Sequence, residues 1–398
     1  MRIAIITASN SPIPATLGGA TENMMTHLID VNEEEHQHEF TIFSYYEEKA
    51  DKISRKYQYT KFHYYKPNAK RDKIYSLFFR ILRKITNEYV YVHSTFVKFC
   101  ARIINNSYFD VVILEGNCFQ VQQFRSLIKN KIILHMHIDR LNNELKSTQK
   151  ILDAADGLFA ISEFCKKRMG GVDPSSMHKV IVVKNTIDTE KFIFRGEKIK
   201  WGIREKLRIR PEQKVISYCG RVDPNKGVLE LVKAMKLLDD VNLHLMIIGS
   251  SIYQGSKRTK YFECIEHEAM SLKGGITFTG YIPQQELPQY MSVSDIAIVP
   301  SLCLEAAGNV TIEALACSVP VIASTQGGIP EYADERACLL VKVDDHFIEN
   351  LAKKIQELVY DDKLYLSLKK SAREIALQYD KHHYYSHFCA AIEKVLNL

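Results

Sequence analysis

Short apolar runs alternate with helical stretches along the whole chain, and this alternation limits the possible folds more than any other feature. Apolar runs of this length are typical of strands buried on both faces of a parallel sheet. The helical stretches between them supply the crossovers that parallel strands need. We therefore predict an α/β protein. Strands are expected at 3–7, 40–43, 111–114, 132–135, 158–161, 180–183, 215–218, 243–248, 276–279, 296–299, 321–323 and 339–341, and helices at 20–31, 143–155, 228–238, 261–272, 310–316 and 348–359, with a last helix ending over 387–396.

The alternation of apolar runs and helical stretches is interrupted once, by a polar and basic stretch near the middle of the chain, and then resumes. A chain of 398 residues is also too long for one ordinary core. We predict a doubly wound domain over 1–195, a linker over 196–212 and a second doubly wound domain over 213–379. Ligands of such sheets bind at the carboxyl ends of the strands, so a cleft between the two sheets is the expected site.

Several classes of protein are excluded by composition. The nine cysteines contain no C-x-x-C pair, which argues against a disulfide scaffold or a structural zinc site and favours a reducing cytoplasm. No window approaches eighteen consecutive apolar residues, as a membrane-spanning helix would require. The first residues, 1–8, are expected to form a buried strand and not a signal peptide.

The loop after the first predicted strand contains Gly18 and Gly19 immediately before a predicted helix. Paired glycines let the backbone approach a ligand, and the helix start directs N–H groups at it. A plain tight turn explains the same residues equally well. The loop lacks the glycine pattern of dinucleotide sites and the Lys-Ser/Thr pair of ATP-binding loops.

A second loop, after the predicted strand 215–218, carries Arg221 and Lys226 and leads into a helix. A guanidinium fork and an ammonium group converging at a helix start can bind a diphosphate. The alternative is a solvated basic turn.

A third loop follows the predicted strand 296–299, with Glu305 before a helix and Glu313 on it. The amides of Gly308, Asn309 and Val310 at the helix start can hold phosphate oxygens. Carboxylates repel phosphate, so the two acids are expected to contact hydroxyl groups such as those of a sugar or ribose. A surface pair of glutamates is the alternative.

Taken together, these motifs resemble a known family. The order Gly18-Gly19, Arg221 and Lys226, Glu305-x7-Glu313, and the Gly-Gly-Ile-Pro-Glu run at 327–331 is similar to that of the retaining GT-B-fold glycosyltransferases of family 4, whose donor domain is glycogen-synthase-like. The likeness covers essentially the whole chain. It implies two tandem Rossmann-like domains with a deep cleft between them, the first on the acceptor side and the second binding a nucleotide-sugar. It also implies that a C-terminal helix, 380–398, packs back on the first domain.

The resemblance implies a role for each matching residue. Arg221 and Lys226 hold the donor diphosphate, Glu305 contacts hydroxyls of the donor sugar, Glu313 contacts the ribose, and the amides of Asn309 and Val310 hold the distal phosphate. Gly19 closes on the diphosphate from the other domain. His137 becomes the active-site histidine, with His135 as its competitor on the same strand face, and the segment up to Asp139 matches a His-Asp strand end with one residue inserted.

The implied reaction is the retaining transfer of a hexose or N-acetylhexosamine from a nucleotide-sugar, with UDP expected as the nucleotide, in the assembly of a cell-surface polysaccharide such as a capsule or lipopolysaccharide. No D-x-D motif follows a strand and two cations are available, so we predict no metal and no other cofactor. Ala307 stands where the family often has Phe and Ser318 where it often has Gly, which leaves the sugar's identity open.

A strongly basic segment points to an anionic partner. Residues 49–102 hold fourteen Lys and Arg against three Asp and Glu, together with twelve Phe and Tyr. Within it, apolar residues at helical spacing over 74–85 are flanked by Lys73, Arg80, Arg83 and Lys84. This pattern suits a helix lying on the inner face of the cell membrane, with a polyprenyl-diphosphate-linked or other glycan as acceptor. A helix that packs its apolar stripe on its own domain fits as well.

Three rival functions share parts of this evidence: a nucleotide-sugar epimerase on the same fold, a nucleic-acid-binding protein that uses the basic and aromatic segment, and a catalytically silent sugar-nucleotide sensor. Binding to nucleic acid would leave the loop of Glu305 and Glu313 without a purpose, so we expect no nucleic-acid partner. The sequence leaves the oligomeric state open.

Overall fold

The computed structural model describes residues 1–7, 11–67, 94–251 and 259–398. It divides into two compact units. Unit 1 contains residues 1–185 and 381–398, and unit 2 contains residues 186–380. Lys73, Arg80, Arg83 and Lys84, predicted as a membrane-directed surface, lie outside the described residues. No helix within the described ranges is long and apolar enough to cross a bilayer.

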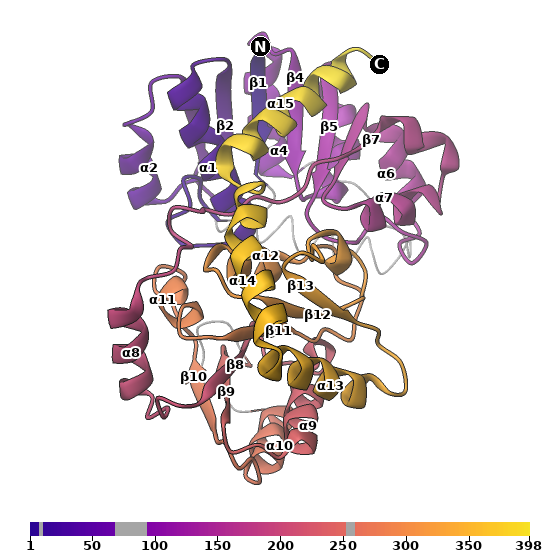
Figure 1. Ribbon diagram of the computed structural model, residues 1–398. Coiled ribbons are helices and arrows are strands. Elements are labelled where there is room, and N and C mark those ends of the chain that lie inside the picture. Colours follow the sequence, from indigo (N-terminus) through magenta and orange to yellow (C-terminus); the bar gives the residue numbers. More distant parts are fainter. Residues whose placement is uncertain (8–10, 68–93, 252–258) are drawn as a thin grey trace. The chain divides into compact units, whose positions relative to one another are not determined.

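Unit 1 is built on a parallel sheet of seven strands in the order β3-β2-β1-β4-β5-β6-β7 (Figure 1). Its strands are β1 (Arg2–Ile6), β2 (Glu39–Tyr45), β3 (Thr60–Tyr65), β4 (Val111–Glu115), β5 (Lys131–Met136), β6 (Gly157–Ala160) and β7 (Val180–Val182). Its α-helices are α1 (Ala20–Glu35), α2 (Glu48–Ser54), α4 (Thr95–Asn105), α5 (Val121–Arg125), α6 (Thr148–Ala154), α7 (Glu163–Gly170) and α15 (Lys381–Leu396).

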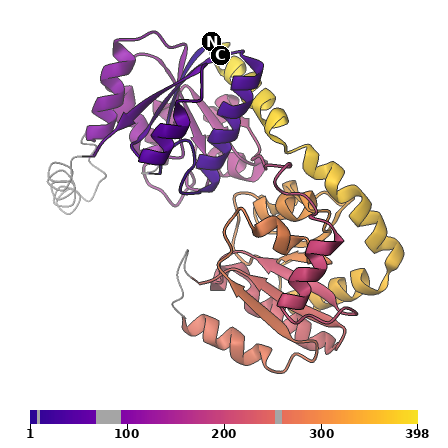
Figure 2. The ribbon, with the colours of Figure 1, turned by 90° about the vertical axis from the view of Figure 1, so that its left-hand side faces the viewer.

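Helix α15 belongs to unit 1 although it follows all of unit 2 in the chain, and Figure 2 shows it beside α1. Its buried face (Tyr384, Tyr385, Phe388, Ile392 and Val395) joins the same core as strands β1, β2, β4 and β5. Gly157 makes room for this helix, because a Cβ there would lie 2.6 Å from methyl groups of Val395. Lys131 donates to the carbonyl oxygens of Val395 and Leu396 at 3.2 and 3.0 Å and so caps the helix C-terminus.

Unit 2 repeats the architecture with six parallel strands in the order β10-β9-β8-β11-β12-β13. The strands are β8 (Lys214–Cys219), β9 (Leu243–Ile248), β10 (Ile276–Gly280), β11 (Ile296–Val299), β12 (Val321–Ser324) and β13 (Cys338–Val341). The α-helices are α8 (Glu197–Lys206), α9 (Val228–Leu238), α10 (Lys260–Ala269), α11 (Leu287–Met291), α12 (Asn309–Ala316), α13 (Phe347–Tyr360) and α14 (Asp362–Leu377). Two buried apolar clusters lie on either side of the sheet.

The predicted α/β class with two doubly wound parallel sheets is confirmed, and each predicted strand lies within a residue or two of an observed one. Strand β3 was not predicted. It pairs with β2 at the edge of the sheet, where only its end residues Thr60 and Tyr65 are buried and Lys61 is exposed, so it lacks the apolar run of the central strands.

The predicted linker, 196–212, holds helix α8 and belongs to unit 2. Two of its basic side chains are buried against Asp295, with Lys200 Nζ at 3.2 Å and Arg204 Nη1 at 3.6 Å from the carboxylate. The residues before it also pack on unit 2, since Ile187 and Phe192 lie in one of its cores. Lys200 and Arg204 thus tie this stretch to unit 2, while its other basic residues (Lys198, Lys206, Arg208 and Arg210) are exposed.

Candidate active site

Most of the candidate site residues lie near the point in each sheet where the strand order reverses, and His135 and His137 lie one strand further along, at the end of β5. In unit 1, successive strands of the chain are added to one side of β1 and then to the other side of β4, so the order reverses between these two neighbours. In unit 2 it reverses in the same way between β8 and β11. At such a switch point the two loops that leave neighbouring strands turn to opposite faces and leave room for a ligand. The loops with Gly18 and Gly19 and with Arg221 and Lys226 follow β1 and β8, and the loop with Glu305 follows β11.

Lys226 and Glu305 are in direct contact in unit 2, although 79 residues separate them. The Lys226 ammonium group is ion-paired with Glu305 Oε1, and each side chain is only about a fifth exposed, at 23% and 22%. The Ser301 hydroxyl donates to the same oxygen at 2.7 Å. The second carboxylate oxygen is thus the one left for a ligand, and the ammonium group lies beside it.

Two close backbone approaches hold this pair in place. Gly227, with φ of +69°, lies under the loop of Pro300, and a Cβ there would be 2.0 Å from the Pro300 carbonyl oxygen. Gly327, with φ of +62°, packs on Glu305 in the same way, since a Cβ there would be 2.2 Å from the Glu305 carbonyl oxygen. The Gly328 amide then donates to that carbonyl at 2.7 Å. Only glycine adopts these dihedral angles and contacts without strain.

Glu313 lies on α12, one helical turn inside the helix that starts after Gly308. Burial disfavours its charged form and raises the pKa of the carboxyl to about 7, against the attraction of Lys191. Desolvation also lowers the pKa of the Lys191 ammonium group. Gly308 has no side chain to cap the first turn, so the N-terminus of α12 is open to an anion from outside the helix. Sequence reasoning missed Lys191, which follows a β-strand by several residues and belongs to no motif.

Arg221 lies apart from this cluster. Its side chain is 66% exposed, and its nearest acid is Asp223 on its own loop, at 3.5 Å. The structure thus brings Lys226 and Glu305 together and leaves Arg221 extended into solvent.

In unit 1, His135 and His137 share one carboxylate. Strand alternation places both rings on one face of β5, with centroids 4.2 Å apart, and Glu115 at the end of the adjacent strand β4 lies between them. His137 Nε2 is 2.6 Å and His135 Nδ1 is 3.1 Å from Glu115 Oε2. Sequence reasoning did not find Glu115. The available signal was a single acid at the carboxyl end of an otherwise apolar strand.

Burial shapes the ionisation of this cluster. Burial opposes the charge on Glu115, but the two imidazoles outweigh it and hold the pKa of the carboxyl below its usual range. Burial and the neighbouring His135 lower the pKa of His137, so its imidazole is neutral near pH 7.

The three side chains of this cluster are of the types that bind metal ions, and one ligand atom from each lies within 4.8 Å of the others. On a tetrahedral zinc ion with bonds of about 2.0–2.1 Å, however, two ligand atoms lie roughly 3.3 Å apart. The 2.6 Å contact of Glu115 with His137 is shorter, and its length is that of a charge-assisted hydrogen bond. Hydrogen bonding therefore accounts for the arrangement.

The paired glycines before α1 adjoin an acid. Glu22 in the first turn of α1 is buried, and a Cβ on Gly19 would lie 2.1 Å from its Oε2. The carboxylate of Glu22 also acts electrostatically on His137. Negative charge at this helix start repels phosphate oxygens, which bears on the predicted contact of Gly19 with a diphosphate.

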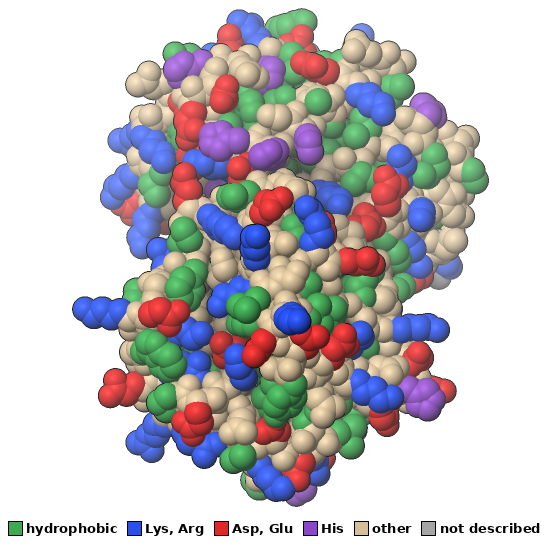
Figure 3. Space-filling model, in the orientation of Figure 1, with side chains coloured by type: hydrophobic (Ala, Val, Ile, Leu, Met, Phe, Trp, Pro, Cys, Tyr) green, Lys and Arg blue, Asp and Glu red, His purple; other side chains and the backbone are tan. Residues whose placement is uncertain are grey.

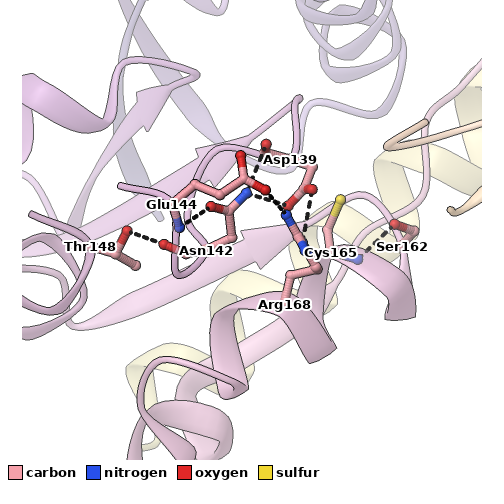
Figure 4. A network of polar contacts seen from close by, with 7 residues as sticks. All are labelled: Asp139, Asn142, Glu144, Thr148, Ser162, Cys165 and Arg168. Atoms are coloured by element: carbon pink, nitrogen blue, oxygen red, sulfur yellow. Dashed lines mark hydrogen bonds and ion pairs between the residues drawn. The ribbon is translucent and has the colours of Figure 1, made fainter. Parts of the chain in front are cut away.

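Asp139 has its own partner, as Figure 4 shows. Its carboxylate accepts from Arg168 Nε at 3.0 Å, and the same guanidinium reaches Glu144 at 2.9 Å. Asn142 closes the turn by donating to Asp139 at 3.4 Å. Arg168 therefore anchors the loop that leaves β5 directly after His137.

On the face shown in Figure 3, basic and acidic side chains are interspersed over both units. A nucleic-acid-binding surface requires Lys and Arg to gather on one face. The described residues on this face do not form such a surface.

The raised pKa of Glu313 leads to a prediction on stability. Between the pKa of an unfolded glutamate and about 7, the folded protein holds one proton more than the unfolded chain, so the free energy of unfolding falls as pH rises through that window. Glu313→Gln should remove this fall. Urea unfolding at pH 5 and pH 8 should show a larger loss of stability for the wild type than for the variant. Equal losses in both proteins would contradict the assignment.

Comparison with known proteins shows what the second unit is similar to. Residues 199–375 match the family of glycosyl transferases group 1. The chain is 29% identical over 227 residues to a GDP-mannose-dependent monoacylated alpha-(1-6)-phosphatidylinositol monomannoside mannosyltransferase of Corynebacterium glutamicum, covering 54% of this chain and 56% of that enzyme. It is 27% identical over 228 residues to a lipopolysaccharide 1,2-N-acetylglucosaminetransferase of Salmonella typhimurium, covering 56% of each.

Structural comparison extends over both units. The crystal structure of Anabaena HepE in complex with UDP matches with a TM-score of 0.73 and 16% identity over 99% of this chain and 100% of that chain. Unit 2 is thus similar to the glycosyl transferases of group 1 over residues 199–375, and the chain as a whole has the GT-B fold.

Proposed function

We propose that the protein is a retaining, metal-independent glycosyltransferase that moves a hexose or N-acetylhexosamine from a UDP-sugar to a glycan or lipid-linked saccharide. The observation that carries the proposal is the contact of Lys226 with Glu305 at the switch point of unit 2, where a cation and a carboxylate lie side by side. The family match of this unit supports a transferase, and the UDP bound to HepE supports the choice of nucleotide.

The reaction requires a nucleoside diphosphate to leave an anomeric carbon. Lys226, held by Glu305, supplies a fixed positive charge for the developing charge on the phosphate, and the exposed Arg221 folds over the diphosphate as a second cation. The first-turn amides of α12, those of Asn309 and Val310, hold the distal phosphate. The departing phosphate oxygen takes the proton of the acceptor hydroxyl, which attacks the same face of the sugar.

The acids bind the neutral parts of the donor. Glu305 accepts hydrogen bonds from sugar hydroxyls through its second oxygen, and Glu313 does the same for the ribose. The loop of Gly18 and Gly19 approaches the donor from unit 1. Because Glu22 lies against Gly19, we propose that this loop contacts the sugar more closely than the phosphates. His137 faces the sugar and the acceptor.

The proposed diphosphate contacts predict a loss of turnover. Arg221→Ala and Lys226→Ala should each lower kcat about a hundredfold or more, because each removes a charge that stabilises the leaving group. Lys236→Ala is the matched control: it removes an exposed ammonium group of the same unit, ion-paired with Glu268 at 2.8 Å, and should leave kcat within about twofold.

Turnover is best measured with a panel of UDP- and GDP-sugars by following both transfer and release of free nucleotide. Wild-type turnover in both site variants would remove these cations from the mechanism. A product consisting of epimerised nucleotide-sugar, without transfer, would replace the transferase with an epimerase.

The two cations also predict that EDTA leaves the rate unchanged. Because Arg221 and Lys226 neutralise the leaving diphosphate, no divalent ion is needed to neutralise its negative charge. The rate of donor consumption should be the same in EDTA and in added Mg²⁺ or Mn²⁺. Loss of activity in EDTA, restored by one of these ions, would contradict the metal-independent mechanism.

We propose a lipid-linked acceptor at an anionic membrane surface, in the assembly of a cell-surface polysaccharide. The support is the basic amphipathic pattern around 74–85 and the lipid and lipopolysaccharide substrates named for the two enzyme relatives. Replacing Arg80, Arg83 and Lys84 by Ser should weaken sedimentation with anionic liposomes, since each charge adds about 1 kcal/mol near such a surface. Donor hydrolysis should stay unchanged. Unaltered liposome binding would assign the segment to packing on its own domain.

A further inference from the structure

The geometry points to Glu115 as a positioning residue for the proposed reaction: its carboxylate accepts the Nε2 hydrogen of His137, fixes that tautomer, and leaves the Nδ1 lone pair to accept a hydrogen bond from a hydroxyl of the bound saccharide. The inference rests on the proposed function for the identity of the hydroxyl. The tautomer itself rests only on the contacts within unit 1.

The contact lengths assign the hydrogens. Ionised Glu115 can only accept, so each ring nitrogen that faces it must carry a hydrogen. His137 donates from Nε2 at 2.6 Å, and His135 donates from Nδ1 at 3.1 Å. The lowered pKa of His137 keeps its imidazole neutral, and a neutral imidazole has a single N–H, so the Nδ1 of His137 is a bare acceptor.

Burial makes this arrangement stable. Glu115 is 2% and His135 is 0% exposed, so neither can exchange its partner for water. The far side of His135 packs on the rings of Phe159 and Phe388, at centroid distances of 5.6 and 6.0 Å. His135 is therefore fixed in the apolar core, and it holds Glu115 from the inner side while His137 holds it from the outer side.

The remaining nitrogen of His137 is the part of the cluster that can act on a ligand. His137 is the more exposed of the two histidines, at 10%, and it follows the last residue of β5 at the carboxyl edge of the sheet. Its Nδ1 has no hydrogen-bond partner among the residues that the structure describes. A buried acceptor without a partner is costly, and a ligand hydroxyl would satisfy it. Which ring nitrogen accepts is set by the bond that the other one makes.

The test reads the tautomer directly. Protein labelled with ¹⁵N-histidine is examined by long-range ¹H–¹⁵N correlation at pH 7.5, with His137→Gln used to assign the resonances. We expect a protonated Nε2 and an unprotonated Nδ1 in wild-type His137. A hydrogen on Nδ1 in the wild type overturns the inference, whatever the variants do.

Two variants separate positioning from folding. Glu115→Met removes the acceptor and should mix the His137 tautomers, while Glu115→Gln keeps one acceptor oxygen and should retain more of the wild-type pattern. In sugar-transfer assays, kcat should fall roughly 10- to 100-fold in Glu115→Met, as on loss of a residue that orients an active histidine, with donor KM within about threefold. Glu115→Gln should restore part of the loss. Glu115→Met with the wild-type tautomer and kcat would refute the positioning role.

Asp156→Asn is the matched control. Asp156 is an ion-paired carboxylate at the opposite end of β5, where it accepts from the Ile132 amide at 2.7 Å and pairs with Arg125. This variant should leave the His137 spectrum and kcat unchanged. Should Glu115→Met fail to fold, the wild-type spectrum and Glu115→Gln still decide the question. If the wild type transfers no sugar from any donor, the proposed function fails, while the spectrum still decides the role of Glu115.

Discussion

Every strand of both sheets is parallel, and this constraint governs where polar chemistry occurs in the molecule. Parallel strands need helical crossovers on both faces, so the strands are largely apolar and most polar side chains lie at the strand ends and in the loops. The carboxyl ends of all strands meet at one edge of each sheet. The sequence therefore needs only a few polar residues, each directly after a strand, to assemble a site from segments far apart in the chain. Lys226 and Glu305 meet in this way, as do Glu115 and His137.

The buried acids Asp295 and Glu115 and the half-buried Glu313 differ in how their charge is stabilised, since a carboxylate without a partner is costly to remove from water. Asp295 pairs with two cations and accepts from the Val215 amide at 2.8 Å, which joins α8 to the sheet. Glu115 relies on the ring nitrogens of two histidines, with no Lys or Arg among its contacts in the described part of the chain. The charge of Glu313 is offset only by the attraction of Lys191, and the pKa of its carboxyl rises to about 7.

Much of the fold was predictable because local periodicity and burial agree in the central strands. Strand β3 was missed because an edge strand needs no continuous apolar run. The extent of α8 in unit 2 was missed because composition does not reveal that Lys200 and Arg204 face Asp295, about ninety residues away. Strand-end logic pointed to the loops of Lys226 and Glu305, but their ion pair depends on backbone contacts at Gly227 and Gly327. The role of Glu115 depends on the strand register that pairs it with His135, and no local sequence pattern predicts that register.

The position of α15 has a consequence for biosynthesis. Residues 381–398 complete the hydrophobic core of unit 1, yet the ribosome makes them after the whole of unit 2. Unit 2 is contiguous in the chain and can reach its native state while translation continues. Unit 1 cannot complete its core until α15 is made, so the apolar surface that later packs against Phe388, Ile392 and Val395 stays exposed. Unit 1 is therefore the part of the nascent chain that depends most on protection from aggregation.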